Sequence, residues 1–471
     1  MLWKKGVNMN SQTELLTPFS PAQPLVPGKK SFPFYRNSTF LCLMIAYGAF
    51  YLCRQNLGIA FIPMQKHLGI DAIQFGWISS VGTFTYAFGK VSIGSLADSK
   101  VGGKVIFYIS LFGSAFFCFL FGFGKGMGFF LVIWSLSRFL QSMGWSGLVN
   151  VICRWFPTKN YGTAMGVMST SYQFGAAIAS LYAGLLLSFG VSWQSLFFLP
   201  ALTLAGIGLI TYPFLISKPE AMGFRLDGQC SHAPKDADAE DETILPYRER
   251  FRKLLANKAF LGILGLSFIL TFLRECFSIW MPAYFFDMGE TASVAAFKST
   301  IFLFLGCVGT LAGGYISDRF LSGRRVPIMG SLLAMLILCL LALSHLETVT
   351  AFSQAYLHIG LTRSRLALFL VGAAGFFLLG SYSFGGVLAM DFGGKKTAGT
   401  AAGLLDGVGY LGATLAGIGI ANVIVRAGWN YMFMVLTGCA TAGILVCICL
   451  WKVQPNEDPT DETGKRDRVT V

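Results

Sequence analysis

The sequence predicts an all-α membrane protein with twelve transmembrane helices arranged in two six-helix halves. Hydrophobic residues make up 54% of the 471 residues and charged residues only 13%, about half the share found in ordinary globular domains. Mean hydropathy is +0.61. Twelve apolar stretches of roughly the 20 residues needed to cross a bilayer follow one another along the chain. A polar stretch divides them into two sets of six.

This composition excludes several classes of protein. A soluble enzyme with this apolar content could not cover itself with polar surface, and a disordered chain or a disulfide-rich secreted module would be far more polar. The eleven Cys lie mostly in apolar runs and the four His are scattered, so neither a disulfide framework nor a metal-ligand spacing emerges. We expect no metal, no cofactor and no enzymatic activity.

The first half follows a polar tail, residues 1–38. This tail lacks a short apolar core followed by a cleavage site, so we expect no cleaved signal peptide. Apolar stretches of helix length then recur between short polar or Gly-containing loops. The six helices predicted for this half span 39–62, 72–97, 104–124, 128–152, 162–188 and 192–217.

The second half follows a polar linker, residues 218–257, in which a run of acidic residues precedes a run of basic ones. The charged, Pro-bearing tail at 453–471 is typical of disordered sequence. We predict one helical bundle before the linker, over 39–217, and a second between the linker and the tail, over 258–452. The six helices predicted for the second bundle span 258–286, 295–318, 326–345, 365–389, 397–424 and 429–452.

The basic residues indicate an orientation. If both termini are cytoplasmic, the inner segments hold 26 Lys or Arg, the outer loops hold six, and four lie inside predicted helices. An inner excess of this kind is the positive-inside signal of membrane proteins. Topology therefore explains most of the net charge of +13. We expect the basic segments to face lipid and cytoplasm, and we expect no nucleic-acid partner.

The two halves repeat their landmarks at one offset. Asp98 lies in GSLADSKVGGK and Asp318 in GGYISDRFLSGRR, 220 residues apart, and the same offset separates Arg54 from Arg274. A shared offset indicates duplicated halves, and parallel repeats about an axis along the membrane normal are the plan of major facilitator transporters. The two Asp-basic loops resemble that superfamily's signature, which implies a gating role for Asp98 and Asp318.

Two arginines inside predicted helices are the main candidates for ligand binding. A charged side chain at the bilayer centre costs about 2.5–3.5 kcal/mol on insertion scales, so it should face a cavity or a partner. Arg54 and Arg274 lie at matching depths of the first and seventh predicted helices, which face each other under two-fold pseudosymmetry. Two guanidinium groups aimed at one cavity suit a phosphate dianion, which arginine binds through parallel hydrogen bonds.

Other charged positions leave alternatives open. Either arginine could instead pair with Glu275 or a backbone carbonyl, but Arg274 and Glu275 are adjacent, so their side chains leave the helix about 100° apart and should not face each other. Lys90 could contact phosphate or extend towards the cytoplasm. Arg138 could line the cavity or serve a structural role. Asp406 could pair with a neighbouring cation or a polar backbone group, or it could contribute to substrate selectivity or coupling.

A closer resemblance covers 39–452. The stretches YLCRQN, LRECFSIWMPAYF and DFGGKKTAGTAAGLLDGVGYLGA resemble the organophosphate:phosphate antiporters, a family that includes glycerol-3-phosphate and hexose-6-phosphate transporters and hexose-phosphate sensors. The resemblance implies that Arg54 and Arg274 bind phosphate and that Lys90 lies near the site.

The sequence departs from the glycerol-phosphate pattern at two positions. Tyr172 stands where glycerol-phosphate carriers use a His, and Gln55 stands where a second basic residue can follow the first arginine. Asp406 lies in a segment that influences substrate choice in hexose-phosphate relatives. The resemblance therefore implies that Tyr172, Gln55 and Asp406 contribute to a site for a hexose phosphate.

We therefore expect a secondary active transporter that exchanges a hexose phosphate, glucose 6-phosphate in particular, for inorganic phosphate by alternating access. We expect it to act as a monomer in a bacterial inner membrane, with both termini cytoplasmic. Two alternatives remain: a membrane receptor that senses external hexose phosphate and signals to a partner kinase, and a glycerol-3-phosphate:phosphate antiporter.

Overall fold

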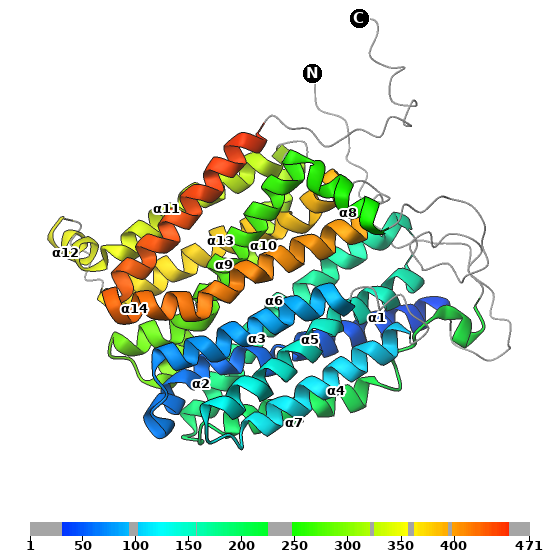
Figure 1. Cartoon of the computed structure of the whole chain (residues 1–471), viewed down its shortest axis with the longest axis horizontal. Helices are drawn as coiled ribbons and strands as arrows, with labels where there is room; N and C mark the ends of the chain where they lie inside the picture. The colour runs from blue at the N-terminus through cyan, green and yellow to red at the C-terminus, as the bar shows by residue number, and fades with distance from the viewer. Residues whose placement is uncertain are drawn as a thin grey trace, which may run out of the picture.

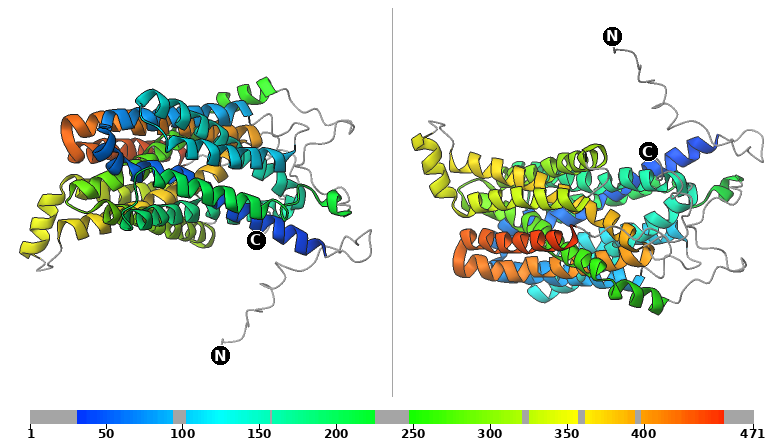
Figure 2. Two further views of the ribbon diagram at one scale, coloured as in Figure 1. Left: turned by 90° about the horizontal axis from the view of Figure 1, so that it is seen from below. Right: turned by 90° about the horizontal axis from the view of Figure 1, so that it is seen from above.

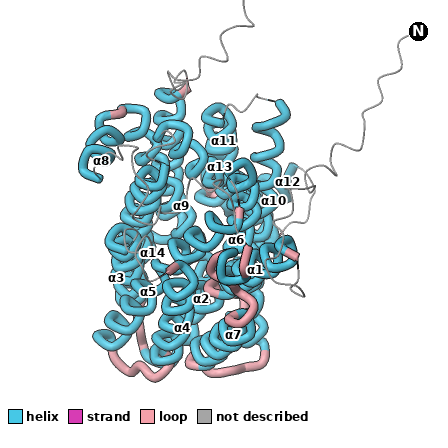
Figure 3. The backbone as a smooth tube through the Cα atoms, turned by 90° about the vertical axis from the view of Figure 1, so that its right-hand side faces the viewer, coloured by secondary structure: helices cyan, strands magenta, loops and turns pink. Residues whose placement is uncertain are grey.

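The computed structural model describes residues 31–93, 102–156, 158–224, 247–320, 325–356, 362–393 and 398–451. Within these ranges the regular elements are all helical (Figure 3), which agrees with the predicted all-α class. The labelled helices α2, α4, α5 and α7 lie on one side of the bundle, and α10, α11 and α13 lie on the other (Figures 1 and 3). These helices of the first and second half therefore lie on opposite sides of the bundle.

The helices of the first half follow the predicted order, and the first span is built from two of them. They are α1 (Phe32–Ala49), α2 (Leu52–Leu68), α3 (Ala72–Ile93), α4 (Gly103–Phe121), α5 (Met127–Trp155), α6 (Thr158–Ser188) and α7 (Ser195–Thr211). A short 3₁₀ helix, η3 (Pro219–Met222), follows.

The second half also follows the prediction, with two additional short helices. It contains α8 (Tyr247–Ala256), α9 (Lys258–Asp287), α10 (Ala292–Phe320), α11 (Arg325–Ser344), α12 (Leu346–Tyr356), α13 (Arg363–Gly393) and α14 (Ala398–Leu450). The sequence predicts no helix at α8, inside the polar linker, or at α12, between the ninth and tenth spans. Both lie at the ends of the bundle: α12 projects from one end, and α8 and the start of α1 lie at the other (Figures 1 and 2).

The predicted single helix over 39–62 is wrong in two respects. It begins at Phe32, and it is interrupted at Phe50 and Tyr51. Around the interruption the backbone amides bond three residues back, from Phe50 to Tyr47, from Tyr51 to Gly48 and from Arg54 to Tyr51. This tighter 3₁₀ winding replaces the α-helical pattern. The break therefore ends three residues before Arg54.

Helix α14 contains the last two predicted spans. The backbone at Gly428 has φ 84° and ψ 179°, a region that is essentially restricted to glycine. The chain turns there, and the two parts of α14 run side by side (Figure 1). The predicted separation into helices over 397–424 and 429–452 is thus confirmed. The two helices are joined by a turn at Gly428 and not by a polar loop.

The two halves meet mainly along α2 with α9, α3 with α14, and α6 with α10, and α2 also touches α10. Along α3 and α14 the backbones touch, because a Cβ added at Gly417 would lie 2.5 Å from the carbonyl oxygen of Gly76. The Ser80 hydroxyl donates to the Thr414 carbonyl at 2.6 Å across the same seam. Small residues allow this close approach of membrane helices. The seam brings side chains of α2, α3, α9 and α14 together.

Six of the described helical segments are long and apolar enough to cross a membrane by length and composition alone. They are Gly103–Phe121, Lys258–Asp287, Ala292–Ile316, Arg325–Ser344, Arg363–Leu388 and Thr400–Leu450.

Candidate functional site

Arg54 and Arg274 converge at the seam between the halves. Arg54 lies at the start of α2 and Arg274 in the middle of α9. The Nη2 atoms of both arginines donate to the hydroxyl oxygen of Tyr410 on α14, at 3.1 Å from Arg54 and 3.4 Å from Arg274. Both side chains are buried, with exposed fractions of 7% and 11%. The structure thus brings the two predicted arginines to one oxygen atom.

Glu275 also contacts both arginines, against the sequence-based expectation that Arg274 and Glu275 do not face each other. Its Oε1 atom lies 2.7 Å from Nη2 of Arg274 and 3.5 Å from Nη2 of Arg54. The expectation is wrong because helical geometry fixes the directions of the Cβ atoms, not the ends of long side chains. Rotation about the four rotatable side-chain bonds of Arg274 and the three of Glu275 brings the charged ends together although the Cβ atoms point about 100° apart.

Aromatic rings surround the two guanidinium groups. The Cζ atom of Arg54 lies 4.8 Å from the ring centre of Tyr86 and 5.3 Å from that of Tyr51. The Cζ atom of Arg274 lies 4.6 Å from the ring centre of Tyr382. Each such cation–π contact contributes about 0.5–2 kcal/mol, more as water is removed. The rings therefore stabilise charges that would otherwise repel each other.

Arg138 adds a third guanidinium; the sequence alone allows either a cavity-lining or a structural role for it. It lies on α5, is only 3% exposed and donates from Nη1 to Oε1 of Gln141 at 2.7 Å. Its Cζ atom lies 4.8 Å from the ring centre of Tyr86, the ring that Arg54 also faces. The sequence signal for this position is the same as for Arg54: an arginine inside an apolar helix.

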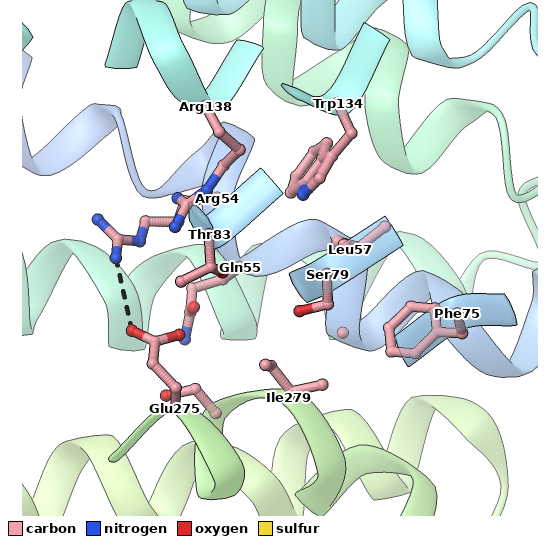
Figure 4. Close-up of a pocket in the computed structure, with 12 residues that line it drawn as sticks. Arg54, Gln55, Leu57, Phe75, Ser79, Thr83, Trp134, Arg138, Glu275 and Ile279 are labelled. Carbon is pink, nitrogen blue, oxygen red and sulfur yellow. Dashed lines mark hydrogen bonds and ion pairs between the residues drawn. The ribbon is translucent and has the colours of Figure 1, made fainter. Parts of the chain in front are cut away.

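Arg54, Arg138 and Glu275 line a pocket between the halves of about 380 Å³, a volume that includes space open to solvent; Arg274 and Tyr410 are not among its walls. Arg54, Arg138 and Glu275 project into it from α2, α5 and α9, and Gln55 lies beside them (Figure 4). Its remaining walls are Leu57, Gly58, Phe75, Ser79, Thr83, Trp134, Ser278 and Ile279. We call Arg54, Arg138, Arg274, Glu275 and Tyr410 the central site.

Lys90 and Asp406 pair with each other beside the central site. The Nζ atom of Lys90 on α3 donates to Oδ2 of Asp406 on α14 at 2.8 Å. Lys90 Nζ also lies 5.8 Å from the ring centre of Tyr86. Of the two alternatives for Asp406, the pairing is therefore the one observed. Its partner is Lys90, for which a phosphate contact and extension towards the cytoplasm were both open.

The remaining predicted residues are more peripheral or lie outside the described residues. Tyr172, on α6, stacks on Tyr51 with ring centres 6.3 Å apart, so it reaches the central site through Tyr51. Gln55 also lines a second pocket of about 260 Å³, with Ser180, Ser299 and Phe302 among its walls. Asp98 lies in the undescribed segment 94–101, and the side chain of Asp318 is likewise outside the described part of the chain.

The charges of this region do not cancel. Among the described side chains around Tyr86 and Tyr410, four cations face two carboxylates, which leaves two positive charges uncompensated: Arg54, Lys90, Arg138 and Arg274 against Glu275 and Asp406. The described residues form no group of three or more His, Cys, Asp or Glu that could hold a metal ion. The region therefore carries an excess of positive charge that a bound anion would neutralise.

Comparison with known families agrees with the helical plan. The sequence profile described as Major Facilitator Superfamily matches residues 43–417. In solved structures, a bacterial homologue of the human lysosomal transporter Spinster covers 88% of this chain and 95% of its own, with a TM-score of 0.63 and 16% identity. The nucleoside transporter NupG covers 89% of this chain and 100% of its own, with a TM-score of 0.64 and 14% identity.

Curated relatives are similar over nearly the whole chain. A "Probable hexose phosphate transport protein" of Chlamydia pneumoniae is 26% identical, over 90% of this chain and 92% of its own. The glycerol-3-phosphate transporter of Bacillus subtilis is 25% identical, over 92% and 93%. The membrane sensor protein UhpC of Escherichia coli is 24% identical, over 88% and 92%. These relatives confirm the resemblance predicted from the sequence.

Proposed function

Because this chain belongs to the Major Facilitator Superfamily and is an integral membrane protein related to transporters of phosphorylated sugars and glycerol, we propose that it exchanges a hexose phosphate for inorganic phosphate. Glucose 6-phosphate is the substrate that we favour. The protein would act as a monomer by alternating access, with the central site exposed to each side of the membrane in turn.

One observation carries this proposal: two buried guanidinium groups from opposite halves reach the same hydroxyl oxygen, Tyr410 Oη. Arginine binds phosphate through parallel charge-assisted hydrogen bonds and stays ionised. A phosphomonoester carries about −1.5 to −2 charges at pH 7, close to the two positive charges that the region leaves uncompensated. Both halves would therefore close on one dianion.

Exchange follows from the shared headgroup. Inorganic phosphate and a sugar phosphate present the same dianionic end to Arg54 and Arg274, so one site serves both. An empty site keeps unbalanced charge, which opposes the rearrangement of the two halves without a ligand. This supports coupled exchange rather than leak of either anion.

The sugar end would be read by polar groups away from the arginines. Asp406 is 36% exposed on its side chain, and its Oδ2 atom is paired with Lys90, so the second carboxylate oxygen can accept a hydrogen bond from a sugar hydroxyl. Tyr172 and Gln55 are the other candidates. Asp98, between the second and third predicted spans, and Asp318, in the last turn of α10, are proposed to bias the inward and outward states.

We place the protein in a bacterial inner membrane with both termini cytoplasmic. The support is the distribution of Lys and Arg, 26 on the inner segments against six in the outer loops.

A membrane receptor for external hexose phosphate is the second candidate, with a sensor kinase as its partner. It is favoured by the similarity to the sensor protein UhpC. The two functions share the ligand and differ in turnover. The glycerol-3-phosphate transporter of Bacillus subtilis supports a third reading, in which glycerol 3-phosphate is the organic substrate.

The test is counterflow in proteoliposomes that contain the purified full-length protein and an internal phosphate load. External radiolabelled glucose 6-phosphate, glycerol 3-phosphate and phosphate are compared in the same preparation. The proposal expects rapid uptake of phosphate and glucose 6-phosphate, with slower uptake of glycerol 3-phosphate. Binding of glucose 6-phosphate without uptake would favour the receptor, and preferred uptake of glycerol 3-phosphate would favour the third reading.

A further inference from the structure

Glu275 occupies a position that a phosphate oxygen would need. Its Oε1 atom contacts Nη2 of Arg274 at 2.7 Å and Nη2 of Arg54 at 3.5 Å. The side chain is 12% exposed. Because Glu275 directly follows Arg274 in the chain, its carboxylate stays near the arginines. An internal carboxylate therefore bridges the two arginines in this structure.

A carboxylate and a phosphate offer similar oxygen atoms to a guanidinium group. A dianion that bridges Arg54 and Arg274 must take the donors that Glu275 now uses. An ionised carboxylate left beside that dianion would repel it, because like charges in a buried site disfavour each other strongly. Glu275 must therefore leave both arginines when the ligand binds, and it needs another cation nearby.

Arg138 meets that requirement. It lines the same pocket as Arg54 and Glu275 (Figure 4). Its Nη1 atom donates to the side-chain oxygen of Gln141, a neutral acceptor, so the guanidinium charge is not matched by the carboxylate of Glu275 as it is at Arg274. A buried charge of this kind gains from a carboxylate partner.

We propose that Glu275 is a tethered competitor for the phosphate group, which bridges Arg54 and Arg274 in the empty site and transfers to Arg138 when a phosphate dianion binds. This inference rests on the proposed function and deepens it. It assigns Glu275 and Arg138 as residues that set affinity and release.

Competition of this kind has a measurable consequence. Each binding event must displace Glu275, so the apparent affinity for phosphate is lower than two free arginines would give. Each release event is assisted, because the carboxylate returns to the arginines as the anion leaves. Glu275 therefore weakens binding and speeds turnover at the same time.

The experiment measures phosphate self-exchange in proteoliposomes and phosphate binding by calorimetry, both with the full-length protein. Glu275→Gln should lower KM and Kd for inorganic phosphate about tenfold, the equivalent of one charge-assisted hydrogen bond no longer in competition, and should lower kcat. Glu275→Asp, which keeps the charge but shortens the side chain, should change both in the same direction by less, and it serves if the Gln variant does not fold.

Arg138 gives the second arm of the test. Arg138→Gln should raise KM for phosphate, because the displaced carboxylate then lacks a partner, and this effect should disappear when Glu275 is already Gln. Such non-additivity is expected only where two residues are coupled. Glu347→Gln is the matched control, since Glu347 pairs with Arg363 on the surface and is 75% exposed. It should change neither KM nor kcat.

The outcomes separate the two claims. Unchanged or raised KM and Kd in Glu275→Gln, or equal effects of Arg138→Gln in both backgrounds, would overturn the competitor role while the exchange function stands. A wild-type protein that neither binds nor exchanges phosphate or a sugar phosphate would overturn the proposed function itself.

Discussion

Lys90 and Asp406, 316 residues apart, form an ion pair of 2.8 Å that joins α3 of the first half to α14 of the second. The pair crosses the seam between the two halves, which would move against each other in the proposed transport cycle. Lys90 is 8% exposed and Asp406 is 36% exposed on their side chains. Removing one partner therefore leaves a largely buried ammonium group without its carboxylate.

The first prediction concerns the stability of this pair. Asp406→Asn should destabilise the purified protein by about 1–3 kcal/mol, the usual cost of an unsatisfied buried polar group. The double variant Lys90→Met with Asp406→Asn should recover most of that loss, because no unpaired charge remains. Thermal unfolding in detergent measures both. If the stability loss of the double variant equals the sum of the losses caused by Lys90→Met and Asp406→Asn separately, the pair contributes nothing across the seam.

The second prediction concerns substrate choice at Asp406. Asp406→Asn should retain phosphate self-exchange but change the ratio of glucose 6-phosphate to glycerol 3-phosphate uptake. A site that accepts a hydrogen bond from a substrate hydroxyl discriminates sharply between substrates, and the variant alters that acceptor. Both rates are measured in the same proteoliposomes. Equal loss of phosphate self-exchange and sugar-phosphate uptake would instead assign Asp406 to the seam alone, and selectivity would then rest on Tyr172 and Gln55.

The third prediction concerns the turn inside α14. Gly428→Ala should destabilise the protein by about 1–3 kcal/mol, because a side chain is poorly accommodated at φ 84°. Gly438→Ala is the matched control: Gly438 is helical, and an added Cβ would meet no atom within 4 Å. Unfolding midpoints compare the two. A control that loses as much stability as Gly428→Ala would rule out backbone strain as the cause.

The fourth prediction concerns pH. Glu290, between α9 and α10, accepts hydrogen bonds from Lys298 and, at 2.6 Å, from Ser364. These bonds lower the pKa of the Glu290 carboxyl below its ordinary value of 4.5. A lowered folded-state pKa gives stability that is present above the unfolded-state value and is lost as the pH falls through the folded-state value.

Unfolding of the wild type and Glu290→Gln should therefore be compared from neutral pH to acid. The wild type should be more stable by a constant amount above pH 4.5, and this advantage should shrink as the pH falls below that value. The exposed Glu347→Gln variant serves as a control. An advantage of the wild type that grows on acidification would contradict the role assigned to the carboxylate.

The sequence was sufficient to predict those features that repeat or that are costly in a membrane. Arg54 and Arg274 were identified by their shared depth and 220-residue spacing, and the structure brings them to the oxygen of Tyr410. The turn at Gly428 was anticipated as a boundary between two apolar stretches. These inferences rely on hydropathy and symmetry, which are visible in one dimension.

The partners of the charged residues could not be predicted in the same way. Lys90 contacts Asp406 because α3 and α14 pack closely. The sequence of neither helix indicates that the other is its packing partner. Glu275 was set aside because the angle between adjacent helical positions describes the Cβ atoms and not the tips of flexible side chains. The interruption before Arg54 lies in an apolar run without Pro, so its sequence carries no signal for 3₁₀ winding.

The measurement that tests the central claim most directly is phosphate self-exchange by Arg54→Lys and Arg274→Lys in proteoliposomes. Lysine keeps the charge but cannot form the planar, two-pronged contact of a guanidinium group, so each variant should lose at least about 100-fold in exchange rate, as expected for the loss of about 3 kcal/mol. Correct folding is checked by thermal unfolding of each purified variant. Folded variants that both exchange phosphate at the wild-type rate would show that the two arginines do not bind the substrate.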